Sequence, residues 1–148
     1  MERILVSMDC LSWGWDALSR AISLSGRIEA KVYALLVMPP STGEACEVKA
    51  AKTCGGALKR LENLVRAARS DNVQIECVVS EGDYEEEVSR FVERKRVTLV
   101  IVERPDEKDP LSERKLARIR RMQHRISCRV ELVRPRKQHP EQRRNQPS

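Results

Sequence analysis

The sequence predicts a single α/β domain, built on one doubly wound, five-stranded parallel sheet with helices on both faces. Short apolar runs rich in β-branched residues alternate with segments whose apolar residues recur at helical spacing. Glycine and proline mark most of the boundaries between them. Strands separated by helices are expected to be parallel, and chirality fixes the hand of their crossovers. A chain of 148 residues is long enough to bury one hydrophobic core.

The first strand and helix occupy the N-terminal quarter of the domain. Residues 3–8 (RILVSM) form an apolar run that is expected to be buried on both faces of the sheet. Ser12 is expected to cap the next helix, with Asp16 in its first turn, where a negative charge suits the helix dipole. Trp13 and Trp15 are expected on opposite sides of this helix start, in packing or capping roles rather than in ligand stacking.

Two further strand and helix pairs follow. The second strand is expected at residues 31–38 (KVYALLVM), where a Pro-Pro pair ends it. The helix after it has an expected break at Gly55, which is followed by a second glycine. Residues 73–79 (VQIECVV) predict the third strand, and Gly82-Asp83 opens the third helix.

The last part of the domain contains the loop on which a small-molecule site would depend. Residues 97–102 (VTLVIV) predict the fourth strand, a helix restarts at Ser112, and residues 129–133 (RVELV) predict the fifth strand. Ligands of parallel α/β sheets bind beyond the carboxyl ends of the strands, so the charged loop after residue 102 should form part of any site. We assign residues 1–134 to the domain and residues 135–148 to a basic, disordered tail, because the tail has nothing to bury.

Charge is distributed unevenly along the chain, whose formal net charge is +6. Residues 112–129 carry seven bases against Glu113 alone, whereas residues 81–87 carry five acids and no base. A solvated helix face is the favoured interpretation. A polyanionic partner or self-association is the alternative.

Five cysteines and two histidines give no ligand spacing typical of zinc, so we predict no metal site. The N-terminus lacks the layout of a signal peptide, and no run of residues is apolar enough to span a membrane. We therefore predict a cytoplasmic protein with reduced thiols. A redox role for Cys46 and Cys54, which lie eight residues apart, is left open.

Three segments together resemble the universal stress protein family over nearly all of residues 1–134. They are the opening RILVSMD with Asp9 at the strand end, the segment VVSEGDYEEEV, and the closing CRVELVR. The resemblance implies an adenine-nucleotide-hydrolase-like, Rossmann-like sheet of order 3-2-1-4-5 with a crevice between strands 1 and 4. It also implies a homodimer that pairs through strand 5, where Val130 and Leu132 would share one face.

Nucleotide-binding members of this family carry a phosphate-loop motif after the fourth strand: Gly, two residues, Gly, nine residues, Gly, then Ser or Thr. On this sequence the four positions fall, without a gap, on Glu103, Asp106, Leu116 and Ala117. None has the required residue. The glycines allow backbone N–H groups to approach phosphate, and two carboxylates at the same place would repel it. The resemblance therefore implies a vestigial pocket.

Other positions of that pocket give no clear indication for or against nucleotide binding. Asp9 matches the acid that the family has near the nucleotide, but Cys10 replaces the small residue that is common next to it. Val37 would line an adenine pocket by the same resemblance, although a valine at a strand end is usually part of the core. ATP binding could be rescued in two ways. Bases near the loop could bind the phosphates, namely Arg104, Arg114 and Lys115, or Mg²⁺ could bridge the carboxylates to a phosphate.

Motifs for enzymatic activity are absent: there is no G-x-G-x-x-G, no Walker A sequence and no G-x-S-x-G. We predict no catalytic residue, no cofactor and no enzymatic activity. The favoured hypothesis is a stress-response or regulatory protein that acts as a dimer through contacts with an unidentified protein partner. A nucleotide-binding protein with a divergent phosphate loop is the alternative. Nucleic-acid binding through the basic helix is a third hypothesis, disfavoured because no aromatic residues lie between the bases.

Overall fold

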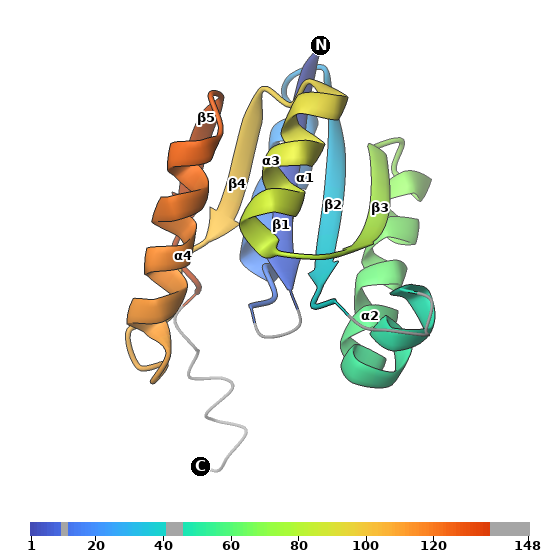
Figure 1. Cartoon of the computed structure of the whole chain (residues 1–148). Coiled ribbons are helices and arrows are strands. Elements are labelled where there is room, and N and C mark those ends of the chain that lie inside the picture. The colour runs from blue at the N-terminus through green and yellow to red at the C-terminus, as the bar shows by residue number, and fades with distance from the viewer. Residues whose placement is uncertain (10–11, 41–45, 137–148) are drawn as a thin grey trace, which may run out of the picture.

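The computed structural model describes residues 1–9, 12–40 and 46–136, with the backbone alone for residues 46–53. Five strands alternate with four helices in this part of the chain (Figure 1). The elements are β1 (Glu2–Asp9), α1 (Trp15–Ser25), β2 (Ala30–Met38), α2 (Cys46–Ser70), β3 (Gln74–Glu81), α3 (Tyr84–Lys95), β4 (Leu99–Glu103), α4 (Ser112–Arg125) and β5 (Arg129–Val133). The predicted order of elements is confirmed. The predicted disorder of the tail stays a prediction, because residues 137–148 lie outside the described part of the chain.

All strand pairs are parallel, and the order is β3-β2-β1-β4-β5. This is the fold class that the alternating pattern predicts and the strand order that the family resemblance implies. The first three strands build one half of the sheet outward from β1, and the chain then crosses back to place β4 on the other side of β1. The carboxyl ends of these two strands therefore form the topological switch point, where such sheets bind ligands.

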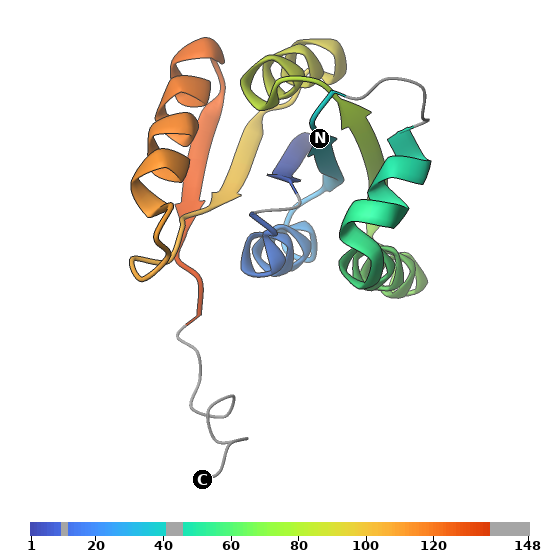
Figure 2. The same ribbon diagram turned by 60° about the horizontal axis from the view of Figure 1, so that its bottom comes forward.

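Two apolar layers cover the sheet, one on each face. α1 and α2 lie on one side, and α3 and α4 lie on the other (Figure 2). Alternate residues of the central strands supply the two layers: Ile4, Val6 and Met8 of β1 pack toward α1 and α2, whereas Leu5 packs toward α3 and α4. Both faces of β1 and β2 are thus buried, which explains why these strands are continuous apolar runs rather than alternating ones.

The helix boundaries confirm some predicted signals and contradict one. Asp83 caps α3, because its carboxylate accepts a hydrogen bond of 3.1 Å from the backbone N–H of Glu86. Gly55 interrupts α2 with φ 31° and ψ −106°, at the predicted break. Ser12, however, does not cap α1: Gly14 holds the N-cap position and offers no side chain.

The two tryptophans lie together, not on opposite sides of the helix start as expected. The rings of Trp13 and Trp15 are stacked with centroids 5.1 Å apart and an angle of 9° between their planes. The guanidinium of Arg60, on α2, lies 4.2 Å from the centroid of the Trp15 ring. The expectation failed because Trp13 precedes α1 and does not follow helical periodicity.

The prediction of reduced thiols is wrong for Cys54, which is disulfide-bonded to a partner outside the described side chains. Spacing along the chain could not indicate which thiols the fold brings together. Cys77 and Cys128 are free, and partial burial raises the pKa of both thiols. Their reactivity as thiolates is correspondingly low.

The acidic and basic stretches that are separate in the sequence lie side by side in the fold, on α3 and α4 (Figure 1). Arg121 Nε donates to Glu85 Oε2 at 2.9 Å. Part of the basic stretch thus faces acids of the same chain. Besides forming the expected solvated helix face, the basic stretch therefore contributes an ion pair between α3 and α4.

Candidate functional site

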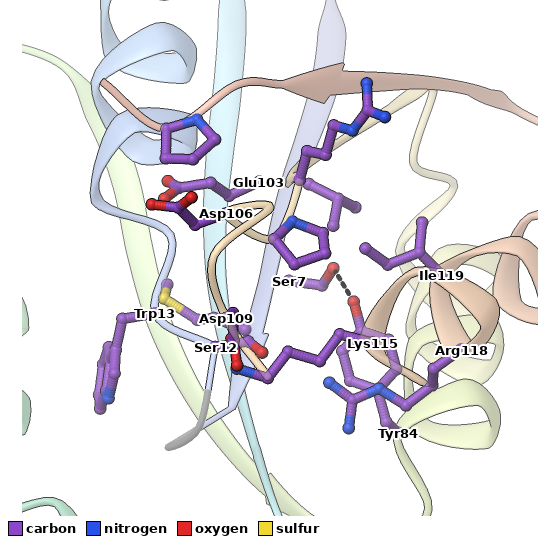
Figure 3. Close-up of a pocket in the computed structure, with 15 residues that line it drawn as sticks. Ser7, Ser12, Trp13, Tyr84, Glu103, Asp106, Asp109, Lys115, Arg118 and Ile119 are labelled. Atoms are coloured by element: carbon purple, nitrogen blue, oxygen red, sulfur yellow. Dashed lines mark hydrogen bonds and ion pairs between the residues drawn. The ribbon is translucent and has the colours of Figure 1, made fainter. Parts of the chain in front are cut away.

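A cavity of about 170 Å³ lies at the switch point, beyond the carboxyl ends of β1 and β4 (Figure 3). Its walls come from the end of β1, the residues before α1, the start of α3, the loop between β4 and α4, and α4 itself. The lining residues are Ser7, Met8, Ser12, Trp13, Tyr84, Val102, Glu103, Arg104, Pro105, Asp106, Asp109, Lys115, Arg118, Ile119 and Pro135. The charged loop after β4 therefore forms part of this cavity, as expected from the parallel sheet.

Glu103, the last residue of β4, caps the N-terminus of α1, which packs against this strand. Its Oε1 accepts hydrogen bonds from the backbone N–H groups of Asp16 at 2.9 Å and Ala17 at 3.2 Å. The first N–H groups of a helix have no partner within the helix, and they favour a negative charge. Burial raises the pKa of Glu103, and these two hydrogen bonds oppose the rise only in part. The carboxylate thus replaces the cap that was expected from Ser12.

The loop after β4 is ordered by its own acids. Asp106 Oδ1 accepts from the backbone N–H of Lys108 at 3.0 Å, and Asp109 Oδ1 accepts from that of Leu111 at 2.9 Å. The ammonium of Lys115 donates to Asp109 Oδ2 at 2.6 Å. The hydrogen bond from Lys115 is the main reason why the pKa of Asp109 lies below its ordinary value. These contacts hold the loop and the start of α4 together.

Arg118 occupies the wall formed by α4. Its Nη1 donates to Asp9 Oδ2 at 2.8 Å, and its guanidinium lies 4.3 Å from the centroid of the Tyr84 ring. The hydroxyl of Tyr84 is hydrogen-bonded to Ser7 Oγ at 2.7 Å. Burial raises the pKa of Tyr84 to about 12, so the phenol is neutral at physiological pH.

The structure brings together only some of the residues that the resemblance placed in a vestigial pocket. Glu103 and Asp106 line the cavity, and Asp9 binds the lining residue Arg118 without lining the cavity itself. Val37 belongs to the buried core under α3. The other three do not line it as far as the structure describes them: Leu116 and Ala117 are half-buried on α4, and Cys10 lies outside the described residues.

Among the bases considered for rescuing an anion site, Arg104 and Lys115 line the cavity, whereas Arg114 is exposed and does not. Sequence reasoning missed Tyr84 and Arg118. A signal for Arg118 exists in hindsight, because it lies three residues after Lys115 and therefore on the same side of α4. Tyr84 belongs to the core under α3, and only the fold shows that it also lines the cavity.

A metal site receives no support from the described residues: they contain no cluster of three or more potential histidine, cysteine or carboxylate ligands. No helix in that part of the chain is both long and apolar enough to cross a bilayer.

Fold and site together define a doubly wound α/β protein with a polar cavity at the switch point. The family model for the universal stress protein family matches residues 1–120, and the chain belongs to that family. No curated protein sequence is significantly similar to it.

Solved structures agree on the fold. The universal stress protein UspA from Lactobacillus plantarum is similar with a TM-score of 0.68 and 14% identity, over 90% of this chain and 97% of that one. A universal stress protein solved in complex with cAMP has a TM-score of 0.68 and 17% identity, over 89% and 96%. A family member from Arabidopsis thaliana with AMP bound has a TM-score of 0.56 and 13% identity, over 93% and 94%. At this identity the likeness shows the fold alone.

Proposed function

We propose that this member of the universal stress protein family is a non-enzymatic regulatory protein that does not bind ATP in the family's usual mode. One observation carries the proposal: the carboxylate of Glu103 occupies the first position of the phosphate-loop motif and is fixed there by α1. Asp106, at the second position, lines the same cavity. A triphosphate placed in this loop would meet two carboxylates.

The electrostatic cost of that arrangement is large. Two like charges 4 Å apart repel by about 4 kcal/mol at an effective dielectric constant near 20. Of the three bases that could compensate, Arg104, Lys115 and Arg118, the last two already bind Asp109 and Asp9. Their recruitment by phosphate would leave these carboxylates without their partners, so the net gain for ATP is small.

The first test is calorimetric titration of the nucleotide-stripped protein with ATP and Mg²⁺ at moderate salt. We expect no binding heat and no thermal shift. The Arabidopsis relative titrated with AMP, the ligand in its structure, is the positive control for the method. Binding of ATP with a micromolar Kd would overturn the proposal.

Micromolar binding would instead favour the second candidate function, a nucleotide-binding protein with a divergent loop. Two observations favour it: structural neighbours are solved with cAMP or AMP, and the cavity contains three bases, Arg104, Lys115 and Arg118. These bases would then hold the phosphate, with Asp9 and Asp109 released.

We further propose that the protein acts as a homodimer through β5. Within the described residues β5 pairs with β4 alone, so its other edge presents free backbone N–H and C=O groups. Such an edge is a template for another strand. Leu132 is 39% exposed beside this edge, and Val130 is half-buried on the same face.

Replacement of Leu132 by arginine is expected to weaken this dimer. Two symmetry-related arginines would bring like charges and long polar side chains to the strand pair. Light scattering at several protein concentrations should show the mass falling from dimer to monomer. Leu64→Arg is the matched control, because Leu64 is 37% exposed but lies on α2, and its mass should not change. A Leu132→Arg variant with the dimer mass would argue against this interface.

A further inference from the structure

The cavity at the switch point has a balanced charge, which distinguishes it from an anion site. Six charged residues line it, three acids and three bases: Glu103, Asp106, Asp109, Arg104, Lys115 and Arg118. Two of the bases are also bound to carboxylates, one of which belongs to Asp9, a residue that does not line the cavity. A ligand with a net charge of either sign would therefore meet as much repulsion as attraction in this cavity.

Four of the lining's polar atoms that make no hydrogen bond among the described residues carry the argument. Two of them, Ser12 Oγ and Arg118 Nε, are buried. The other two are carboxylate oxygens: Glu103 uses Oε1 for α1, and Asp106 uses Oδ1 for its loop, which leaves Oε2 and Oδ2. Polar groups buried without a partner cost free energy, so Ser12 Oγ and Arg118 Nε favour a ligand that satisfies them. The two carboxylate oxygens are not buried in this way, and they offer a ligand further acceptors at the same cavity.

The chemistry of these four atoms is mixed. Arg118 Nε–H only donates, the two carboxylate oxygens only accept, and the serine hydroxyl does both. The carboxylates of Glu103 and Asp106 lie across the cavity from Arg118 (Figure 3). An alcohol group is the simplest neutral group that donates to a carboxylate and accepts from a guanidinium. Several alcohol groups on one short carbon chain would reach both walls.

We propose that this cavity binds a small, uncharged polyhydroxylated molecule. The volume of about 170 Å³ corresponds to roughly five or six water molecules at about 30 Å³ each. It is smaller than the sites of about 300–1,000 Å³ that hold drug-sized ligands. A polyol or sugar of about five carbons fits this size, and the apolar atoms of Tyr84 and Ile119 can pack against its C–H groups.

The test uses xylitol, a five-carbon polyol, and xylonate, which has a carboxylate on a chain of the same length. The chain has two tryptophans, so a ¹⁵N-correlation spectrum has two indole N–H signals, assigned with the Trp15→Phe variant. Trp13 lines the cavity and is the reporter. We expect saturable shifts of its signal with xylitol, and a Kd for xylonate that is about fivefold higher or more.

Ser12→Ala removes one of the unpartnered groups and should raise the Kd for xylitol about fivefold, the effect of one hydrogen bond. Ser19→Ala is the matched control, because Ser19 is exposed on α1 and does not line this cavity. Its Kd should match that of the unaltered protein. No saturable shift with xylitol would mean that the cavity holds water alone, and tighter binding of xylonate would identify an anion site. Either result would overturn the proposal, as would an unchanged Kd in Ser12→Ala.

This inference rests on the proposed function in one respect, the exclusion of phosphate from the cavity. The two tests are separable. ATP binding without xylitol binding refutes both proposals, whereas the absence of both ligands refutes the polyol site and leaves the proposed function standing.

Discussion

Leu36→Ala is expected to lower the free energy of unfolding by about 3 kcal/mol, within the range of roughly 2–5 kcal/mol for such core truncations. Leu36 is fully buried on β2, where it pairs with Met8 of β1 and Val79 of β3. Elements pack on both sides of this strand, so the cavity left by the missing carbons cannot close easily. Urea denaturation with equal m-values for the two proteins measures the difference, and Tm should fall by roughly 6–12 °C.

Leu64→Ala is the matched control, since it makes the same chemical change at a side chain that is 37% exposed. We expect a loss well below half of that for Leu36. Equal losses at the two positions would contradict the layered core described for the sheet.

Glu103→Ala is expected to destabilise the protein by about 1–2 kcal/mol, the effect of losing a helix N-cap. The substitution leaves the N–H groups of Asp16 and Ala17 without their partner in a partly buried place. Glu103→Gln is the matched variant, because its amide oxygen can still accept both hydrogen bonds. It should therefore retain most of the stability at neutral pH. A glutamine variant as unstable as the alanine variant would show that the charge, rather than the capping oxygen, supports α1.

The same pair of proteins gives a pH dependence with a definite sign. The pKa of Glu103 is raised on folding, so the folded state holds this proton more strongly than the unfolded chain does. Its contribution to stability is present at low pH and is lost as the pH rises from the ordinary pKa of 4.5 through the folded value. Across that window the stability of Glu103→Gln should increase relative to that of the unaltered protein. Urea midpoints measured at several pH values would show a constant difference if burial did not disfavour the charge.

The parts of the fold that could be predicted are those set by local patterns. β1 and β2 are recognisable because a strand buried on both faces must be apolar throughout. The cap at Asp83 and the break at Gly55 are equally local, since each depends on one residue and its immediate neighbours. Strand order depends on contacts between segments that are distant in sequence, so local patterns do not predict it. It was implied only by the resemblance to the family.

The site could be predicted less well, because its contacts join distant segments. Glu103 was expected to repel phosphate, but its bond to α1, 86 and 87 residues away in sequence, is a product of the fold. Ser12 is a good capping residue by type, yet its hydroxyl has no partner among the residues that the structure describes. The Tyr84–Ser7 contact joins residues 77 positions apart. Composition and spacing carry no information on such pairs.

Asp16, at the start of α1, binds the ends of two neighbouring strands of the sheet. Its N–H is held by the end of β4, and its carboxylate is held by the backbone N–H and the guanidinium of Arg136, just after β5. The consequence concerns conformational entropy. The start of α1 and the ends of β4 and β5 lose their conformational freedom when the chain folds. A ligand of the cavity would therefore meet side chains that are already ordered, and its binding would cost little further conformational entropy.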